Sequence, residues 1–342
     1  RRITSIGKIT YNKSVRLGSG SHGTLVYEGF YGGVPAAIKR IPKMETSSAI
    51  DAEIKLLLSM LDADDTGKSG SEHVVRYYGK EENEDFCFLA MERMHLTLQK
   101  LVHQCRSQLS QLRMYYSCPG IAGMDDAKLQ QFAGPLYETV IWLPRAPSRE
   151  LLRSVLLGVQ FLHENSIVHN DLKPGNVLLT ADYKVKIADM GLALALSDGQ
   201  HSFSFRSGDN TGAVPSGLGG YFAPEVLAGE RKTVKVDVFA AGCLAYYILT
   251  GGFHPFETGG KLKREANIMD GLHDLSRLCA MPLAQDLVCA MIARDPEKRP
   301  SLADVLAHPF FCSAQGTMDA FNAALWLPAD RQDAIRAALK EG

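Results

Sequence analysis

Three short motifs in the second half of the chain constrain its fold and chemistry more than any other feature. They are HNDLKPGN at 169–176, DMG at 189–191 and APE at 223–225. An acid, a lysine and an asparagine in one loop, followed by a second acid before glycine, form the set that phosphoryl transfer requires. The pattern predicts that Asp171 orients the attacking hydroxyl, that Asp189 holds Mg²⁺ against the phosphates, and that Asn176 is a neutral oxygen ligand.

The composition limits the alternatives. The 342 residues, 46% of them hydrophobic, suffice for two modest lobes or one large domain. Lys plus Arg (37) nearly balance Asp plus Glu (38), so bulk charge favours neither a nucleic-acid nor a membrane-surface partner. The seven cysteines form no Cys-x-x-Cys pair, which favours a reducing compartment over a zinc site or a disulfide framework.

No segment reads as a membrane span or a signal peptide. The longest apolar run, Val238 to Leu249, is too short to cross a bilayer and predicts a buried helix. The chain begins with Arg1-Arg2 and has no initiator methionine, so we expect a segment of a longer protein whose flanks carry any targeting signal.

The first part of the chain predicts a nucleotide site. Residues 15–41 alternate apolar and small residues around glycines, as a twisted antiparallel sheet does. Gly18, Gly20 and Gly23 would let backbone N–H groups approach phosphate oxygens, although a plain glycine-rich hairpin explains the spacing equally well. Lys39, at the end of the next β-run, is the candidate phosphate-pairing lysine.

The partner of Lys39 is expected on the following helix. Residues 49–61 have helical periodicity, and Glu53 borders the apolar stripe of this helix. We therefore predict an ion pair between Glu53 and Lys39. Glu45 is the alternative acid.

Two further segments complete the predicted site. Residues 85–94 read as a strand that leads into a hinge, with Met91 at the back of an adenine pocket and Leu178 as its floor. Residues 151–164 predict an amphipathic helix, capped by Ser148, that runs into the 169–176 loop. Within that loop Lys173 would neutralise the moving phosphoryl group.

Three charged residues beyond the loop have predicted structural roles. Asp237, on a buried helix, is expected to accept hydrogen bonds from the backbone of the 169–176 loop. Arg299 is expected to pair with Glu225, because buried charges require such partners. His169 is expected to be a packed structural residue.

Residues 7–311 resemble a eukaryotic serine/threonine protein kinase, and more narrowly the inositol-requiring enzyme family, the kinase-ribonucleases that sense unfolded proteins. The resemblance rests on the motifs above, on IGKI at 6–9, on GTLVYEG at 23–29, on HSFSFRSG at 201–208 and on HPFF at 308–311. It implies a bilobal α+β fold with a small antiparallel β-sheet N-lobe, containing one main helix, and a larger, mainly helical C-lobe. The expected divisions are 1–94 (N-lobe and hinge), 95–311 (C-lobe) and 312–342 (the incomplete start of a ribonuclease-like region).

The resemblance also implies particular site residues. The catalytic set is Asp171, Lys173, Lys39 and Glu53, with Asn176 and Asp189 as metal ligands. The ATP site is implied at Gly18, Gly20, Gly23, Val26, Ala37, Lys39, Met91, Glu92, Met94 and Leu178. Ser202, Ser204 and Ser207 stand where the family autophosphorylates.

This sequence departs from the family pattern at three places. Asn170 replaces the arginine that contacts a phosphorylated activation loop, so the phosphate would need another cation, such as Arg206 or Arg231. Leu218 replaces a hydroxyl residue that bonds to the catalytic aspartate and lysine. Residues 103–147 form an exposed insertion, either disordered or a docking element, because they greatly exceed a usual linker.

Two functions from different classes follow. The first is an ATP- and Mg²⁺-dependent serine/threonine kinase that phosphorylates a second copy of itself, on the cytosolic side of the endoplasmic reticulum in the full-length stress sensor. The second is a nucleotide-sensing scaffold in which ATP or ADP stabilises a dimer. An ordinary cytosolic kinase is a third reading. In all of them this segment is expected to bind no nucleic acid directly and to reach a membrane only through its missing flanks.

Overall fold

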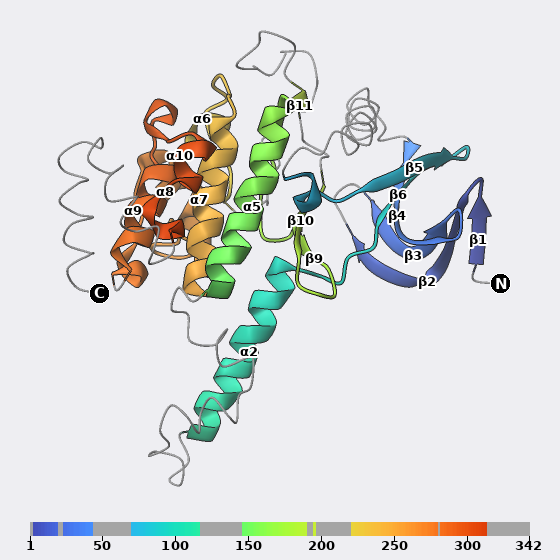
Figure 1. Cartoon of the computed structure of the whole chain (residues 1–342), viewed down its shortest axis with the longest axis horizontal. Helices are drawn as coiled ribbons and strands as arrows, with labels where there is room; N and C mark the ends of the chain where they lie inside the picture. Colours follow the sequence, from blue (N-terminus) through green and yellow to red (C-terminus); the bar gives the residue numbers. More distant parts are fainter. Residues whose placement is uncertain are drawn as a thin grey trace.

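The computed structural model describes residues 3–19, 23–43, 70–116, 146–189, 194–195, 220–279 and 281–312. Strands form a smaller lobe, at the right of Figure 1, and helices form a larger lobe. This arrangement confirms the predicted α+β bilobal fold with an antiparallel sheet in its first part. The helix expected at 49–61 lies outside the described residues.

The small lobe is a six-stranded antiparallel sheet with the order β1-β2-β3-β4-β6-β5. Its strands are β1 (Ile3–Ile6), β2 (Ile9–Ser19), β3 (Leu25–Tyr31), β4 (Val34–Pro42), β5 (Tyr77–Glu82) and β6 (Phe86–Glu92). The antiparallel strands predicted within 15–41 are therefore confirmed, as is the strand that leads to the hinge.

One face of this sheet points toward the large lobe. Val26, Lys39 and Leu89 lie opposite one another on three neighbouring strands, and Ala37 lies opposite Met91. Directly opposed residues share a face of a sheet. Because Ala37, Leu89 and Met91 belong to the same buried cluster as the helices of the large lobe, this face joins the two lobes.

The other face has a core of its own because the sheet curls. Tyr11, Tyr27 and Phe88 are buried there in a separate cluster. The two edges of the sheet meet where the N–H of Lys8, in the β1–β2 turn, donates to the Glu81 carboxylate on β5 at 3.0 Å. Gly7 has φ +54°, and a Cβ there would lie 2.2 Å from the Glu81 carboxyl, so glycine is favoured at this junction.

The large lobe is built around two long helices that run side by side in Figure 1, α5 (Ala146–Glu164) and α7 (Lys235–Thr250). Leu152, Val155, Leu156 and Val159 of α5 are fully buried. The other α-helices among the described residues are α2 (Leu98–Tyr116), α6 (Pro224–Leu227), α8 (Arg264–Asp270), α9 (Pro282–Met291) and α10 (Leu302–Leu306). Helix α7 contains Val238–Leu249, which confirms the predicted buried helix.

Two predicted boundaries change. Helix α5 begins at Ala146, so Ser148 lies inside its first turn and the prediction that it caps the helix was wrong. Proline is compatible with the first turn of a helix, so Pro147 did not delay its start. Helix α2 continues to Tyr116, so the segment 103–147 begins within a helix.

Short elements link the lobes and frame the predicted loop. The strands β7 (Leu96–Thr97), β9 (Val177–Leu179) and β10 (Val185–Ile187) form one small sheet, and β8 (Ile167–Val168) pairs with β11 (Leu194–Ala195). Single-turn 3-10 helices complete the described elements: η3 (Ser71–His73), η4 (Lys261–Lys263), η5 (Ser276–Leu278), η6 (Pro296–Lys298) and η7 (Pro309–Phe311).

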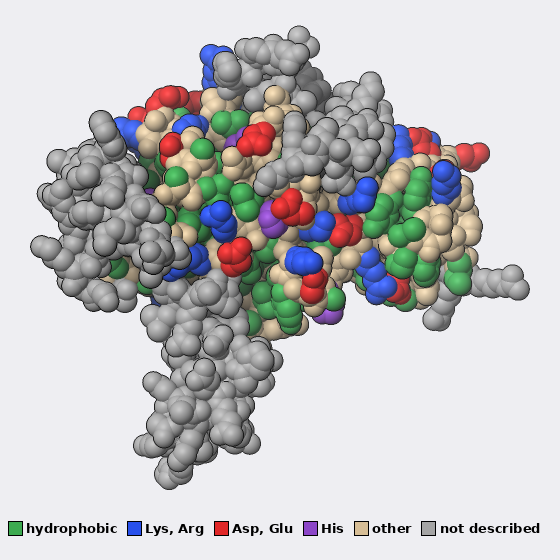
Figure 2. Space-filling model, in the orientation of Figure 1, with side chains coloured by type: hydrophobic (Ala, Val, Ile, Leu, Met, Phe, Trp, Pro, Cys, Tyr) green, Lys and Arg blue, Asp and Glu red, His purple; other side chains and the backbone are tan. Residues whose placement is uncertain are grey.

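The surface matches the near-neutral composition. On the face shown in Figure 2, acidic and basic side chains lie interspersed rather than gathered by sign. Among the described helices, none combines the length and the apolar character that a membrane span requires.

Candidate active site

The 169–176 loop joins β8 to β9, and β8 itself follows α5. Asp237 holds the first residues of this loop in place. The carboxylate of Asp237 accepts the backbone N–H groups of His169 and Asn170, each at 2.8 Å, and Nε2–H of His163 at 2.9 Å. Asp237 is only 1% exposed. Burial pushes its pKa up, but hydrogen bonding and the nearby imidazoles outweigh burial and hold the pKa below its ordinary value. The predicted role of Asp237 is confirmed.

His169 is a second anchor of the loop. Its side chain is fully buried, its Nε2 lies 3.1 Å from the Ala188 carbonyl, and its Nδ1 accepts the N–H of Asp171 at 3.2 Å. These partners require the neutral tautomer with the proton on Nε2. A histidine held in this way is structural, as predicted.

The loop brings three of the predicted site residues together. Nζ of Lys173 donates to Oδ2 of Asp171 at 2.6 Å. Nδ2 of Asn176 donates to the same oxygen at 2.9 Å and to the Asp171 carbonyl at 2.8 Å. Both hydrogen bonds of Asn176 use its nitrogen, so its amide oxygen is the atom suited to a metal ion.

A second pair crosses from the small lobe to the large lobe. Nζ of Lys39, on β4, lies 2.8 Å from Oδ1 of Asp189, which follows β10. The ammonium of Lys39 lowers the pKa of Asp189 more than burial raises it, so this carboxylate stays ionised. Asp189 has φ 67°, a left-handed conformation that aspartate adopts more readily than most residues.

The predicted adenine-site residues lie at one junction between the lobes. Ala37 and Met91 belong to the main buried cluster, and Val26, Met94 and Leu178 pack against it. Glu92 lies at the hinge, where its N–H donates to the Arg76 carbonyl at 2.8 Å. Gly18 lies in β2, and Gly23 adopts φ +71° in the turn before β3.

Several predicted residues lie outside the described part of the chain. They are Gly20, Glu53 and its alternative Glu45, the serines Ser202, Ser204 and Ser207, the candidate phosphate-binding cation Arg206, and Leu218, which departs from the family pattern. Their roles remain predictions. Arg231, the other cation proposed for a phosphate, is exposed just after α6.

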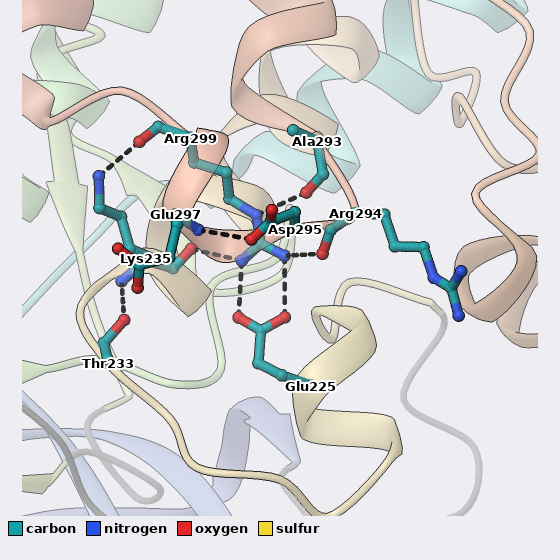
Figure 3. Close-up of polar contacts among 8 residues, drawn as sticks. All are labelled: Glu225, Thr233, Lys235, Ala293, Arg294, Asp295, Glu297 and Arg299. Atoms are coloured by element: carbon teal, nitrogen blue, oxygen red, sulfur yellow. Dashed lines mark hydrogen bonds and ion pairs between the residues drawn. The ribbon is translucent and has the colours of Figure 1, made fainter.

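Below the loop, Glu225 and Arg299 form the predicted buried ion pair, shown in Figure 3. Two parallel hydrogen bonds, of 2.6 and 2.8 Å, join the guanidinium to the carboxylate. The guanidinium also donates to the carbonyls of Ala293, Arg294 and Lys235 at 2.7–3.0 Å. This network ties the APE motif, at the start of α6, to the last part of the lobe.

Besides the Lys39–Asp189 pair, two contacts that support the site were not foreseen from the sequence. His163, at the end of α5, shares Asp237 with the loop, and its place six positions before His169 gave no periodic signal. Lys186 of β10 pairs with the hinge residue Glu92 at 2.9 Å. That pair joins the large lobe to the hinge. The alternation of side chains along a strand indicates which face each one is on, but it does not indicate which distant residue it contacts.

A two-lobed fold with this loop and this cross-lobe pair defines a protein kinase. The family model described as Protein kinase domain matches residues 124–311, more than half of the chain. The chain belongs to the protein kinase family, and its relatives are named serine/threonine-protein kinases.

Relatives confirm the narrower resemblance. The chain is 33% identical over 318 residues to the serine/threonine-protein kinase/endoribonuclease IRE1a of Arabidopsis thaliana, covering 91% of this chain and 36% of the relative. It is 35% identical over 310 residues to the probable serine/threonine-protein kinase ireA of Dictyostelium discoideum (90% and 29%). It is 33% identical over 355 residues to the serine/threonine-protein kinase/endoribonuclease IRE2 of Homo sapiens (100% and 33%). The chain thus spans about a third of the length of these curated relatives.

Proposed function

We propose that this chain is an ATP- and Mg²⁺-dependent serine/threonine kinase whose main substrate is the activation loop of a second copy of itself. The observation that carries the proposal is the cluster of Asp171, Lys173 and Asn176 within hydrogen-bonding distance, completed by the Lys39–Asp189 contact across the lobes. A carboxylate, two cations and two metal-ligand groups are what positioning and electrostatic stabilisation of a phosphoryl group require.

Each residue has a distinct task in this proposal. The carboxylate of Asp171 orients the serine hydroxyl and accepts its proton. Lys173, already 2.6 Å from Asp171, lies where it can offset negative charge as the phosphoryl group moves. Lys39 pairs with the phosphates and, through Asp189, fixes the distance between the lobes.

The donor set fits ATP with Mg²⁺. When bound, ATP supplies the phosphoryl group and Mg²⁺ neutralises charge on its phosphates. The ionised Asp189 and the amide oxygen of Asn176 are hard oxygen ligands of the kind that Mg²⁺ prefers. At the hinge, the N–H of Glu92 donates to the Arg76 carbonyl, and the Glu92 carbonyl and the Met94 backbone are the groups that would hold adenine.

The cellular role rests on the family resemblance and is part of the proposal. Dimerisation of a full-length stress sensor in the endoplasmic reticulum membrane would bring two of these segments together on the cytosolic side. Ser202, Ser204 and Ser207 would then receive phosphate in trans. The attached effector would respond to the resulting oligomer.

One observation favours a second candidate. Asn170 carries no charge, so the position before Asp171 does not supply the cation that would join a phosphorylated activation loop to the catalytic loop. That is compatible with a scaffold in which nucleotide binding stabilises a dimer without phosphoryl transfer. The retained Asp171, Asn176, Asp189 and Lys39 argue against it, because a scaffold has no need of all four.

The deciding experiment is label transfer from γ-labelled ATP with Mg²⁺ at low and high protein concentration. We expect labelling that rises with protein concentration and disappears in Asp171→Asn, while nucleotide binding persists. Asp182→Asn, in an exposed turn, is the matched control and should behave as the wild type. Nucleotide binding without labelling in the wild type would establish the scaffold instead.

A further inference from the structure

The backbone from η3 to the start of β5 is fastened to the large lobe, although β5 itself belongs to the small lobe. The N–H of Val75 donates to the Ile187 carbonyl on β10 at 2.8 Å, and Val74 forms a parallel bridge with the same residue. Contact with α5 is equally close, since a Cβ on Gly158 would lie 2.8 Å from the His73 carbonyl oxygen. This stretch of backbone is therefore fixed to β10 and α5.

Glu92 ties the end of β6, where the hinge begins, to the same stretch of backbone. Its N–H donates to the Arg76 carbonyl at 2.8 Å, and the N–H of Arg76 donates in return to Oε2 of Glu92 at 3.3 Å. Nζ of Lys186, on β10, lies 2.9 Å from that same oxygen. Two groups that are fixed to the large lobe therefore converge on one carboxylate oxygen of the hinge.

Lys186 is the stronger of these two partners of the Glu92 carboxylate. Only 16% of the Lys186 side chain and 24% of the Glu92 side chain are exposed, so water and salt screen this ion pair less than a pair on the open surface. Its hydrogen bond joins two charged groups, whereas the donor of Arg76 is a neutral N–H at a longer distance. Removing the ammonium of Lys186 would therefore free much of the Glu92 side chain, and with it the hinge backbone.

We infer that Lys186 positions the hinge for adenine by holding the Glu92 carboxylate against the large lobe. The inference rests on the proposed adenine site, and Lys186 is a positioning residue because it acts through Glu92. A hinge that is placed correctly only part of the time lowers the apparent affinity for a nucleotide in proportion to that fraction. The phosphate end of the site is built separately, from Lys39 and Asp189, so the step that follows binding does not involve Lys186.

The direct test is calorimetric titration of Lys186→Met with adenosine and with ADP and Mg²⁺. We expect both Kd values to rise by the same factor, about fivefold or more, because adenosine has no phosphate and reports on the adenine end alone. In label transfer, KM for ATP should rise by that factor while kcat stays within about twofold of the wild type. Lys184→Met is the matched control, because Lys184 directly precedes β10 but pairs with Asp182 in an exposed turn, and it should change none of these values.

Further variants separate positioning from a general loss of structure. Lys186→Arg keeps a cation beside Glu92 and should hold the Kd for adenosine within about twofold of the wild type. Glu92→Gln removes the other charge and should raise this Kd about as much as Lys186→Met does. Because both changes break the same contact, adding Lys186→Met to Glu92→Gln should raise the Kd by less than about twofold further.

The possible results distinguish this inference from the proposed function. An unchanged Kd for adenosine in Lys186→Met, or a fall in kcat as large as the rise in KM, would overturn the positioning role. A wild-type chain that does not bind adenosine would overturn it together with the adenine site. A chain that binds adenosine with the expected dependence on Lys186, yet transfers no label, would support the inference and overturn the kinase function.

Discussion

Arg299 holds Glu225 by two parallel hydrogen bonds, of 2.6 and 2.8 Å, and neither side chain is more than 4% exposed. Removing one partner of a buried pair leaves a charge without compensation, which costs about 3–5 kcal/mol. We therefore expect Arg299→Ala to lower the free energy of unfolding by about that amount, as measured by denaturant titration.

Arg294→Ala is the control for this change, because the Arg294 side chain is exposed and points away from the pair in Figure 3. Its effect should remain within about 0.5 kcal/mol. A loss of less than about 1 kcal/mol in Arg299→Ala would show that the pair does not hold the end of the activation segment.

Asp237→Asn tests how the catalytic loop is supported. The amide presents N–H groups toward a place where the carboxylate accepts from His163, His169 and Asn170, so at least one donor loses its acceptor. We expect kcat to fall by about tenfold or more, with KM for ATP nearly unchanged, because the adenine site lies at the hinge. Asp270→Asn, at the exposed last residue of α8, should change neither parameter. A rise confined to KM would contradict this account.

Lys39→Met should reduce label transfer by about 100-fold or more, because it removes the cation that lies 2.8 Å from Asp189 and that would pair with the phosphates. The pKa of Asp189 should rise, because the ammonium no longer offsets the effect of burial, so that the Mg²⁺ concentration needed for residual activity increases as pH falls. A Mg²⁺ titration at several pH values measures both effects. Lys184→Met, at an exposed turn, is the matched control.

Lys232 makes stability depend on pH. It is 2% exposed, and burial lowers its pKa to about 8, although Glu225 opposes this shift. The unfolded chain therefore binds more protons than the folded chain between about pH 8 and about pH 10.5, so the contribution of Lys232 becomes less destabilising as pH rises through that window.

Lys232→Met should accordingly raise the melting temperature at about pH 7, and its advantage over the wild type should fade toward about pH 10. Paired thermal denaturation curves across this range provide the measurement, and the exposed Lys298→Met provides the control. An advantage that grows with pH would contradict the assigned direction.

Much of the fold could be predicted because its signals are local. The glycines and alternating residues of 15–41 predict strands, the apolar run at 238–249 predicts a buried helix, and both are present. The Glu225–Arg299 pair and the role of Asp237 followed from one rule, that a buried charge needs a partner. These inferences required no knowledge of which segments meet in space.

What could not be predicted depends on contacts between distant segments. The hydrogen bond from the backbone N–H of Lys8 to Glu81 and the ion pair of Lys186 with Glu92 have no local signature, since each joins segments that are distant in the sequence. The predicted start of α5 was wrong because serine is a common N-cap residue. Pro147 is equally compatible with the first turn, and the helix begins before it. Tertiary packing decided among these possibilities.

The junction between the β1–β2 turn and β5 sets a limit on where this domain can start. The described residues before β2 cover one end of the small-lobe cluster of Tyr11, Tyr27 and Phe88 and fasten the outermost strand of the sheet to the opposite edge. A shortened chain beginning near Leu17 would keep Gly18, Gly23 and Lys39, yet it would lose Tyr11, leave the rings of Tyr27 and Phe88 open to water, and leave both sheet edges unprotected. Such a chain would retain the residues of the nucleotide site and still lose the lobe that presents them.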